Sequence, residues 1–249
     1  MAVQVYFIGA GPGDPELLTI RAKNIIERAD VIIYADSLIN PKVCGFAKSD
    51  AEIHPSASLS LEEITEIIAN AVKQGKVVAR LQSGDPSIYG AIQEQMVALD
   101  EKRIEYEIIP GVSSLFAAAA ALKTEFTIPE LSQTVIITRM EGKTPVPASE
   151  NLKSLAQHQA SLAIFLSASL IEKVVAELLA GGYHPETPAA VVYRATWQDE
   201  VVLRTTLSNL VERMKTSGIR KQALILVGAF LNPEGKRRSK LYDRGFKRE

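Results

Sequence analysis

The sequence has very little of the residue types that build disulfides and zinc sites. It contains one cysteine, Cys44, among 249 residues, so a disulfide framework and a cysteine-based zinc site within one chain are excluded. The three histidines, His54, His158 and His184, are far apart, and none belongs to an HExxH pair. We therefore expect no metal site, and we interpret His54, which precedes a proline, as a loop histidine.

Long apolar runs and a targeting segment are also missing. The apolar run around 116–122 is far too short to cross a bilayer. The first residues lead directly into a strand-like segment, without a basic region or a cleavage site. These features predict a cytoplasmic protein with no membrane partner.

The chain also lacks an excess of charge of either sign. Its formal net charge is −1, from 28 basic and 29 acidic side chains. Residues 232–249 hold seven Lys/Arg and three Asp/Glu, a net charge of +4, which leaves the other residues at −5. Because the basic excess is confined to this tail and has few aromatic residues interleaved, we expect no nucleic-acid partner.

Apolar β-branched runs alternate with segments of helical period in the first half. We predict strands at 3–8, 31–34, 77–81 and 104–109. Helices are predicted at 15–29, with Asp14 as N-cap, at 61–74, with Ser60 and Glu63 as a capping box and Gly75 as its stop, and at 88–102 and 113–122. This βαβα order indicates a parallel sheet covered by helices.

The second half repeats the α/β pattern after a segment without clear period. We predict strands at 134–138, 163–166, 189–193 and 223–227, helices at 170–180 and 207–215, and an antiparallel strand at 200–205. The expected organisation is a domain at 1–123, a crossing at 124–133, a domain at 134–231 and the basic tail 232–249. The expected fold class is two α/β domains, each a mostly parallel mixed sheet flanked by helices.

Three glycine-containing turns follow the strands of the first half. The first turn, Gly9-Ala10-Gly11-Pro12-Gly13-Asp14-Pro15, departs from a dinucleotide fingerprint, because its third glycine comes one residue early. An acid at position 14 would also repel a pyrophosphate. The alternative is a tight strand-to-helix turn in which Asp14 caps the helix.

The second turn, Ser83-Gly84-Asp85-Pro86, and the third turn, Pro110-Gly111-Val112-Ser113-Ser114, have similar positions. Asp85 is predicted to cap a helix that begins near Ser87. The serines of the third turn can cap a helix or bind a ligand carboxylate. Ligands of open α/β sheets lie beyond the carboxyl ends of the strands, and acid-bearing turns there favour a neutral or cationic ligand.

The only tryptophan follows a strand, in Tyr193-Arg194-Ala195-Thr196-Trp197. It is interpreted as a functional residue or as a core aromatic beside a solvated arginine. No Ser/His/Asp or Cys/His triad is evident, and the spacing gives no metal set.

The three turns resemble those of the tetrapyrrole methylase family, which carries a GxGPGDP turn, a Gly-Asp-Pro turn and a PGVxS turn. Within the family, the sequence resembles the enzymes that methylate carbon 11 of precorrin-4 or cobalt-precorrin-4. The segments that carry this finer resemblance are 34–38, 127–131, 133–139, 142–147, 165–168, 194–197, 219–223 and 238–243.

The resemblance implies two α/β domains with S-adenosylmethionine held in the cleft between them, a homodimer, and S-adenosylhomocysteine as a product. It also implies a tetrapyrrole substrate bound on the side of the first turn. The residues that the resemblance assigns to the cofactor are Pro12, Gly84, Asp85, Ser87, Ser113, Ser114, Leu166, Ala195, Ala223 and Leu224. The candidates for the substrate are Gly11, Gly13, Asp36, Arg80, Glu130, Arg139 and Arg194, of which the three arginines are chosen for their positions near predicted strand ends.

The implied reaction is a direct methyl transfer to carbon 11 of (cobalt-)precorrin-4, which gives (cobalt-)precorrin-5 in cobalamin biosynthesis. Asp36, Glu130 and Tyr89 are candidates for a general base by motif alone. Arg80, Arg139 and Arg194 can pair with substrate carboxylates, or they can be structural. Two alternatives stay open: another ring position or acceptor within the family, and a non-catalytic carrier of the cofactor or tetrapyrrole. The lack of a GxGxxG turn and of a convincing ribose-binding acid argues against a nicotinamide-dependent dehydrogenase.

Overall fold

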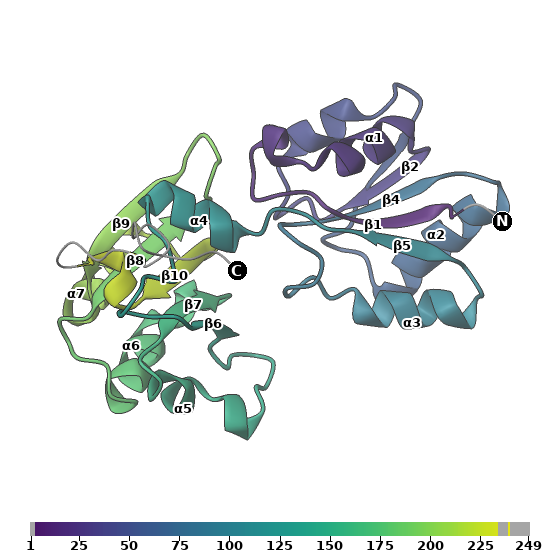
Figure 1. Cartoon of the computed structure of the whole chain (residues 1–249). Coiled ribbons are helices and arrows are strands. Elements are labelled where there is room, and N and C mark those ends of the chain that lie inside the picture. The colour runs from purple at the N-terminus through teal and green to yellow at the C-terminus, as the bar shows by residue number, and fades with distance from the viewer. Residues whose placement is uncertain (1–2, 234–238, 240–249) are drawn as a thin grey trace, which may run out of the picture. The chain divides into compact units, whose positions relative to one another are not determined.

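The computed structural model describes residues 3–233 and residue 239. It divides into two compact units by its internal contacts. Unit 1 comprises the described residues up to Ala117 together with Thr196–Gln198, and unit 2 comprises Ala118–Ala195 and the described residues from Asp199 onward. Each unit is built around one five-stranded sheet (Figure 1).

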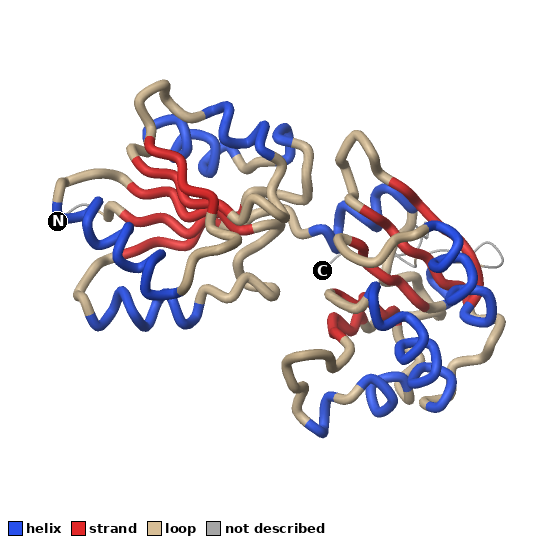
Figure 2. The backbone as a smooth tube through the Cα atoms, turned by 180° about the vertical axis from the view of Figure 1, so that it is seen from behind, coloured by secondary structure: helices blue, strands red, loops and turns tan. Residues whose placement is uncertain are grey.

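The sheet of unit 1 is parallel throughout. Its strand order is β3-β2-β4-β1-β5, and all four pairings are parallel. Helices cover both of its faces (Figure 2). The carboxyl ends of the strands therefore all lie at the same end of the sheet, which we call its carboxyl edge. The elements are β1 (Val5–Gly9), β2 (Val31–Tyr34), β3 (Glu52–Pro55), β4 (Val78–Gln82), β5 (Tyr106–Ile109), α1 (Ile20–Arg28), α2 (Leu61–Lys73) and α3 (Gln93–Glu101).

Alternation along β1 divides the apolar residues of unit 1 into two cores. Ile8 packs with Ile25 and Ile26 of α1 on one face. Phe7 packs with Ile68 of α2 and Leu99 of α3 on the other face. Burial on both faces explains why β1 and β2 are almost continuously apolar.

The sheet of unit 2 is mixed, with the order β6-β7-β10-β8-β9. The β6–β7 pair is parallel, whereas β10 runs antiparallel to β7 and to β8, and β8 runs antiparallel to β9. One face packs on helices through Leu162, Val191 and Ile225. The elements are β6 (Val135–Arg139), α5 (Leu152–Ala156), β7 (Ser161–Phe165), α6 (Ile171–Ala180), β8 (Pro188–Tyr193), β9 (Val201–Thr206), α7 (Leu207–Ser217) and β10 (Ala223–Val227); α4 (Ser114–Leu122) begins in unit 1 and ends in unit 2.

The predicted fold class is confirmed, but the strand directions of the second sheet differ from the prediction. The antiparallel direction of β9 is confirmed. The expectation that this sheet is mostly parallel is wrong, because β10 is antiparallel to both of its neighbours. Helix α7 connects β9 to β10 as a crossover, and such a connection keeps the strand direction. Because β9 runs antiparallel to β8, β10 runs antiparallel to β8 as well.

Two predicted helices begin later than expected. The helix predicted at 15–29 is a short 3-10 turn, Pro15–Leu17, followed by α1, because Leu18 and Thr19 are extended. Asp14 caps the 3-10 turn, by accepting from the N–H of Glu16, and Thr19 caps α1. The helix predicted from 88 begins at Gln93, because Tyr89 and Ala91 have φ angles of +56° and +48°, which an α-helix excludes.

Several local predictions are confirmed, and one residue was placed wrongly. The bounds of β2 and β10, the capping box of α2 and the left-handed Gly75 after that helix agree with the prediction. His54 lies in β3, so its interpretation as a loop residue is wrong. This edge strand was missed because three of its four residues are exposed, the fourth is partly exposed, and its apolar run is too short to be distinctive.

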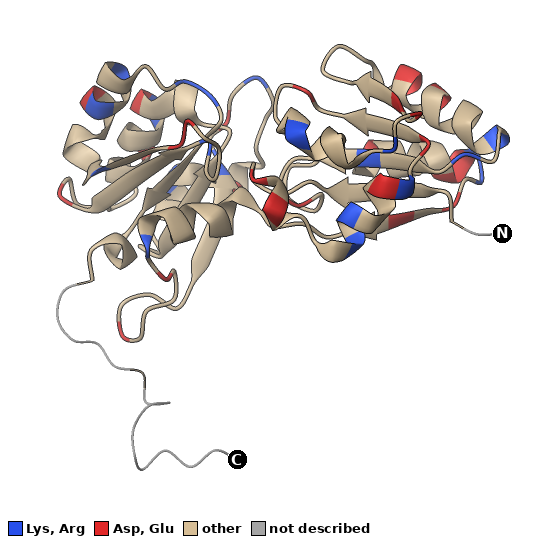
Figure 3. Cartoon of the chain, turned by 90° about the horizontal axis from the view of Figure 1, so that it is seen from above, with Lys and Arg blue, Asp and Glu red and all other residues tan. Residues whose placement is uncertain are grey.

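Charged side chains of both signs are spread over the helices and loops of each unit (Figure 3). Within the described residues, no helix is long and apolar enough to cross a membrane, and no three His, Cys, Asp or Glu side chains group as metal ligands. The predicted domain limits, 1–123 and 134–231, stay a prediction. Most of the predicted tail, 234–238 and 240–249, lies outside the described residues.

Candidate functional site

The three turns of unit 1 interlock at the carboxyl edge of its sheet. Gly11 and Gly84 form an antiparallel bridge: the N–H of Gly11 donates to Gly84 O at 3.2 Å, and the N–H of Gly84 donates to Gly11 O at 2.8 Å. The third turn joins them through the N–H of Gly111, which donates to Asp85 Oδ2 at 2.8 Å. Residues up to 100 positions apart are thus brought together by hydrogen bonds, as the parallel order of the strands predicts.

Glycine is required where these turns cross. A Cβ atom on Gly111 would lie 2.3 Å from Gly84 O and 2.6 Å from Gly9 Cα. A Cβ on Gly9 would lie 2.5 Å from Gly111 Cα. Because the obstructing atoms belong to the backbone, neither neighbour can move aside without deforming a turn.

Asp85 fastens the second turn to the third. Its Oδ1 accepts from the N–H of Ser87 at 2.9 Å and from the Ser87 hydroxyl at 2.5 Å. Burial alone would raise the pKa of Asp85, but the hydrogen bonds from Ser87 and Gly111 outweigh it, so the pKa lies below the usual 3.8. The prediction that Asp85 caps a helix near Ser87 is wrong, because the next helix begins at Gln93. The carboxylate is ionised at neutral pH and holds two turns together.

The far side of the first turn is held by residues distant in sequence. Asn40 Nδ2 donates to Gly13 O, Trp197 Nε1 donates to Pro12 O, and the N–H of Asp14 donates to Thr196 Oγ1, each at 2.9 Å. A Cβ on Gly13 would lie 2.1 Å from Trp197 Cδ1, so the indole occupies the space that glycine leaves.

These contacts decide between the interpretations of the first turn. A phosphate-binding turn needs free backbone N–H groups, yet those of Gly11 and Asp14 donate to protein acceptors. The geometry supports the clamped strand-to-helix turn and does not support a dinucleotide site. Sequence reasoning missed Asn40, Thr196 and Trp197 as partners of this turn; the glycine at position 13 was the available signal.

The serines of the third turn lie at the start of α4. Ser113 is buried, and its Oγ accepts from the N–H of Leu115 at 3.2 Å. This contact favours the capping interpretation for Ser113. A role for Ser113 or Ser114 in cofactor binding stays a prediction.

The predicted cofactor residues of unit 2 gather at one edge of its sheet. In the strand pairing Ala223 lies opposite Tyr193, and the N–H of Arg194 donates to Gln222 O at 2.9 Å. β10 starts at this edge, where β7 and β8 end, because it runs antiparallel to both. The reversed strand therefore brings Ala223 and Leu224 beside Ala195, and near Leu166, which follows β7.

Three non-glycine residues with left-handed backbone lie at this second edge. The φ angles are +54° for Leu166, +46° for Arg194 and +54° for Gln222. Each such residue costs roughly 1–2 kcal/mol in backbone strain. Strain of this kind clusters at ligand-binding sites, where the surrounding structure holds it in place.

The three arginines assigned to the substrate all have partners within the protein. Arg80 is buried and bonds to Gln95 Oε1 and Ser56 Oγ, both at 3.0 Å. Arg139 donates to Thr144 O at 3.2 Å and Pro145 O at 2.6 Å, which holds the proline-containing loop. Arg194 forms an ion pair with Asp199, so it is not simply solvated. These contacts favour the structural alternative, and binding roles for the three stay predictions.

The candidates for a general base lie in three different segments of the chain. Asp36 is exposed and accepts from the N–H of Ala57 at 3.0 Å. Tyr89 is 44% exposed in the loop after the second turn. Glu130 has a φ of +62° in the segment between α4 and β6. Their roles stay predictions.

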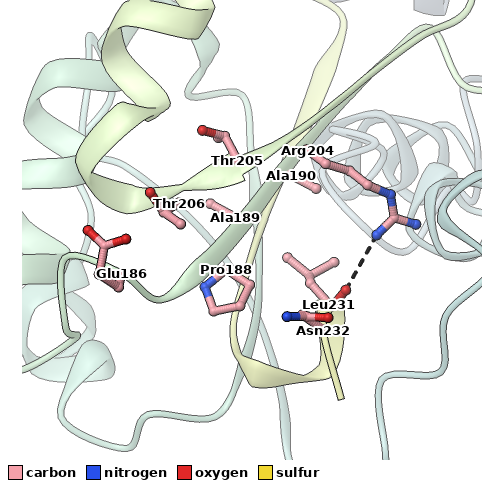
Figure 4. A pocket seen from close by; sticks show the side chains of 9 residues that line it. All are labelled: Glu186, Pro188, Ala189, Ala190, Arg204, Thr205, Thr206, Leu231 and Asn232. Carbon is pink, nitrogen blue, oxygen red and sulfur yellow. Dashed lines mark hydrogen bonds between the residues drawn. The ribbon is translucent and has the colours of Figure 1, made fainter. Parts of the chain in front are cut away.

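A hollow of about 360 Å³ lies elsewhere on unit 2 (Figure 4). It is lined by the start of β8 at Pro188 and the end of β9 at Thr206, the opposite end of this strand pair from Ala195. Arg204 Nη1 donates to Leu231 O at 3.4 Å on its rim. None of the residues that we assigned to cofactor or substrate lines it, so the hollow does not belong to the predicted site.

Comparison with known proteins decides the family. Residues 4–211 match the family described as tetrapyrrole (corrin/porphyrin) methylases. The chain belongs to the tetrapyrrole methylase family. The resemblance seen in the three turns is confirmed.

Individual relatives are similar over nearly the whole chain. The cobalt-precorrin-4 C(11)-methyltransferase of Methanocaldococcus jannaschii is 58% identical over 246 residues, which cover 99% of this chain and 95% of that protein. The X-ray structure of a cobalamin biosynthetic enzyme, cobalt precorrin-4 methyltransferase, matches with a TM-score of 0.90 at 49% identity, over 92% of this chain and 96% of that one.

A third match bears on the cofactor. The crystal structure of uroporphyrin-III C-methyl transferase from Thermus thermophilus, complexed with S-adenyl homocysteine, has a TM-score of 0.77 at 26% identity, over 92% of this chain and 98% of that one. In this chain, the residues that the family resemblance assigned to the cofactor lie in the interlocked turns of unit 1 and at the strained edge of unit 2.

Proposed function

We propose that this tetrapyrrole methylase transfers a methyl group from S-adenosylmethionine to carbon 11 of cobalt-precorrin-4, in the route to cobalamin. The observation that carries the proposal is the 58% identity, over 99% of the chain, to a cobalt-precorrin-4 C(11)-methyltransferase. Similarity at that level and over that length supports the same ring position and a cobalt-containing substrate.

The chemistry of the two edges fits S-adenosylmethionine. This cofactor carries an ammonium and a sulfonium and no phosphate. The ionised Asp85 lies in the second turn, and the N–H groups of Gly11 and Asp14 in the first turn donate to protein acceptors. The predicted holders are Asp85 and its neighbours in unit 1, and Leu166, Ala195, Ala223 and Leu224 in unit 2.

S-adenosylmethionine supplies a methyl group on sulfur that a nucleophilic carbon can take directly. Such a transfer needs little acid–base help at the methyl group, so the task of the protein is to position the reactants. Correct positioning of two reactants contributes roughly 7–11 kcal/mol to catalysis. The crossing of the three turns at Gly9, Gly84 and Gly111 supplies the rigidity that this task requires.

We also propose that the enzyme is a cytoplasmic homodimer, as the family resemblance implies. Light scattering on the purified chain tests the dimer: twice the chain mass of 27.1 kDa is expected. A mass of 27.1 kDa at enzyme-assay concentrations would contradict it.

The proposed reaction is tested by incubating the purified protein with S-adenosylmethionine and cobalt-precorrin-4 and taking a mass spectrum of the tetrapyrrole. A gain of one CH₂ unit, located at carbon 11 by NMR, is expected. No gain, with S-adenosylhomocysteine still binding tightly, would contradict the proposed acceptor and favour another acceptor or a non-catalytic carrier. The same assay with cobalt-free precorrin-4 distinguishes the two substrates.

A further inference from the structure

A buried amide without a partner lies at the end of the central strand of unit 1. Gln82 is the last residue of β4 and is 6% exposed. Its Nε2 is buried, and no described residue accepts a hydrogen bond from it. Buried donors of this kind are rare, because an unpaired donor destabilises the folded state. None of the roles assigned to the candidate site uses this side chain.

A buried positive charge lies two residues earlier on the same strand. Arg80 is 5% exposed, and side chains at positions i and i+2 of a strand lie on the same face. Among the described residues, its other partners besides Gln95 and Ser56 are backbone oxygens, at 3.4 Å for Ile33 and 3.5 Å for Leu81. Within the described residues, no carboxylate forms an ion pair with it. Burial lowers the pKa of Arg80 to about 10, so it stays charged at neutral pH.

Together, the two side chains favour a negatively charged hydrogen-bond acceptor on this face of β4, at the end of the strand. Both offer N–H donors, and a cation buried without a counter-charge raises the local potential. Gln82 directly precedes the second turn, at the edge where ligands of parallel sheets bind. An ammonium group would be repelled there, whereas a carboxylate would be bound by charge and by a hydrogen bond.

We propose that Gln82, supported by the charge of Arg80, is a binding subsite for a carboxylate oxygen of a bound substrate. The inference rests on the proposed methyl transfer, whose two reactants both carry carboxylates: the peripheral side chains of the tetrapyrrole and the amino-acid end of S-adenosylmethionine. Their shared chemistry is what the subsite recognises, and separate measurements distinguish the two sources.

The Gln82→Leu variant separates binding from folding. It keeps the size of the side chain and removes a donor that bonds to no described residue, so the midpoint of thermal unfolding should stay the same or rise. Binding of the carboxylate should weaken about tenfold, the usual effect of losing one hydrogen bond to a charged group. S-adenosylhomocysteine, which keeps the amino-acid carboxylate, is measured by calorimetry, and the tetrapyrrole by the KM for cobalt-precorrin-4.

The Gln82→Glu variant gives a second and opposite signature. The new carboxylate can pair with Arg80, so the unfolding midpoint should rise, while the substrate carboxylate is repelled and binds more weakly than in Gln82→Leu. Gln93→Leu is the matched control, because Gln93 is exposed at the start of α3 in the same unit. A merely structural role would instead lower the unfolding midpoint in Gln82→Leu and leave both binding constants unchanged.

A tenfold rise in the KM for cobalt-precorrin-4 alone assigns the subsite to the tetrapyrrole, and a tenfold loss of S-adenosylhomocysteine affinity assigns it to the cofactor. Unchanged values of both in Gln82→Leu would overturn the proposal. If the wild-type protein methylates no tetrapyrrole, the proposed function fails separately, and the subsite then stands or falls with the S-adenosylhomocysteine affinity.

Discussion

The two sheets bring their candidate residues together in different ways. In unit 1, glycines allow the turns to approach so closely that a Cβ on Gly111 would lie 2.3 Å from Gly84 O. In unit 2, the corresponding edge has non-glycine residues, such as Leu166 and Gln222, in left-handed conformations. Where the turns of unit 1 cross, side chains are omitted so that the backbones can touch, whereas the edge of unit 2 keeps side chains on strained backbone. The difference indicates that unit 2 needs side chains at its edge, and unit 1 needs backbone contact.

The strand directions explain why the candidate residues of each unit gather at one end of its sheet. A parallel sheet aligns the carboxyl ends of its strands without further help. The mixed sheet achieves the same only because the start of β10, at Ala223, lies beside the ends of β7 and β8.

The largest effect is expected where the glycine contacts are tightest. Gly111→Ala should destabilise the protein by about 3 kcal/mol, because the new Cβ meets backbone atoms of Gly9 and Gly84 that cannot move aside. Denaturant unfolding measures it. Gly45→Ala is the matched control, since nothing lies within 4 Å of a Cβ there, and it should change stability by less than about 0.5 kcal/mol. Equal effects of the two changes would show that close approach is not what holds this edge.

The next effect concerns the carboxylate that joins two turns of unit 1. Asp85→Ala should cost about 2 kcal/mol, since it removes the acceptor of bonds from Ser87 and Gly111, and it should weaken S-adenosylhomocysteine binding. Calorimetry and denaturant unfolding measure the two quantities.

The pH dependence of Asp85 follows from the sign of its shift. Because its pKa is lowered on folding, its stabilising contribution is present above the unfolded value of 3.8 and is lost as the pH falls through the lowered folded value. The stability difference between wild type and Asp85→Ala should therefore shrink between about pH 5 and pH 2. A difference that stays constant over that range would contradict the proposed hydrogen-bonded clamp.

A smaller effect is expected at the far side of the first turn. A Cβ in Gly13→Ala would lie 2.1 Å from Trp197 Cδ1, and the indole, being a side chain, can move away. We expect a loss of about 1 kcal/mol, from the Nε1–H bond to Pro12 O, and a red-shifted tryptophan emission. Trp197 is the only tryptophan, so the emission reports on this contact alone. Emission identical to that of Gly45→Ala would contradict the packing of the indole on the turn.

Local features of this fold could be predicted from the sequence, and long-range contacts could not. The capping box at Ser60 and the limits of β2 depend on neighbouring residues, so pattern alone located them. Asp85 was misjudged because its partner Gly111 is 26 positions away, whereas the helix cap that we expected is a local motif. The contact of Trp197 with Pro12 joins residues 185 positions apart.

Strand direction and side-chain burial illustrate two other limits. The direction of β10 follows from that of β9 and from the helix between them. The predicted order of elements therefore implied this direction, and the expectation of a mostly parallel sheet did not take it into account. Arg80 was placed near a strand end, where an arginine can reach a ligand. Its burial depends on Gln95 and Ser56, which the chain brings to it from α3 and from the end of β3. Nothing in the spacing of these residues indicates that they meet.

The smallest predicted effect addresses whether the strain in unit 2 serves the site. Gln222→Gly should stabilise the protein by about 0.5 kcal/mol, since relief of its left-handed strain slightly exceeds the entropy cost of glycine. Gln159 has a similar φ of +49° but lies before β7, at the end opposite Leu166, and its Nε2 donates to Gly182 O at 3.2 Å, so Gln159→Gly is the control for binding and not for stability. Only Gln222→Gly should weaken S-adenosylhomocysteine binding, by a few-fold, because it loosens the backbone that pairs with Arg194. Equal affinities in the two variants, measured by calorimetry, would show that the strain at this edge is a consequence of the fold and has no part in binding.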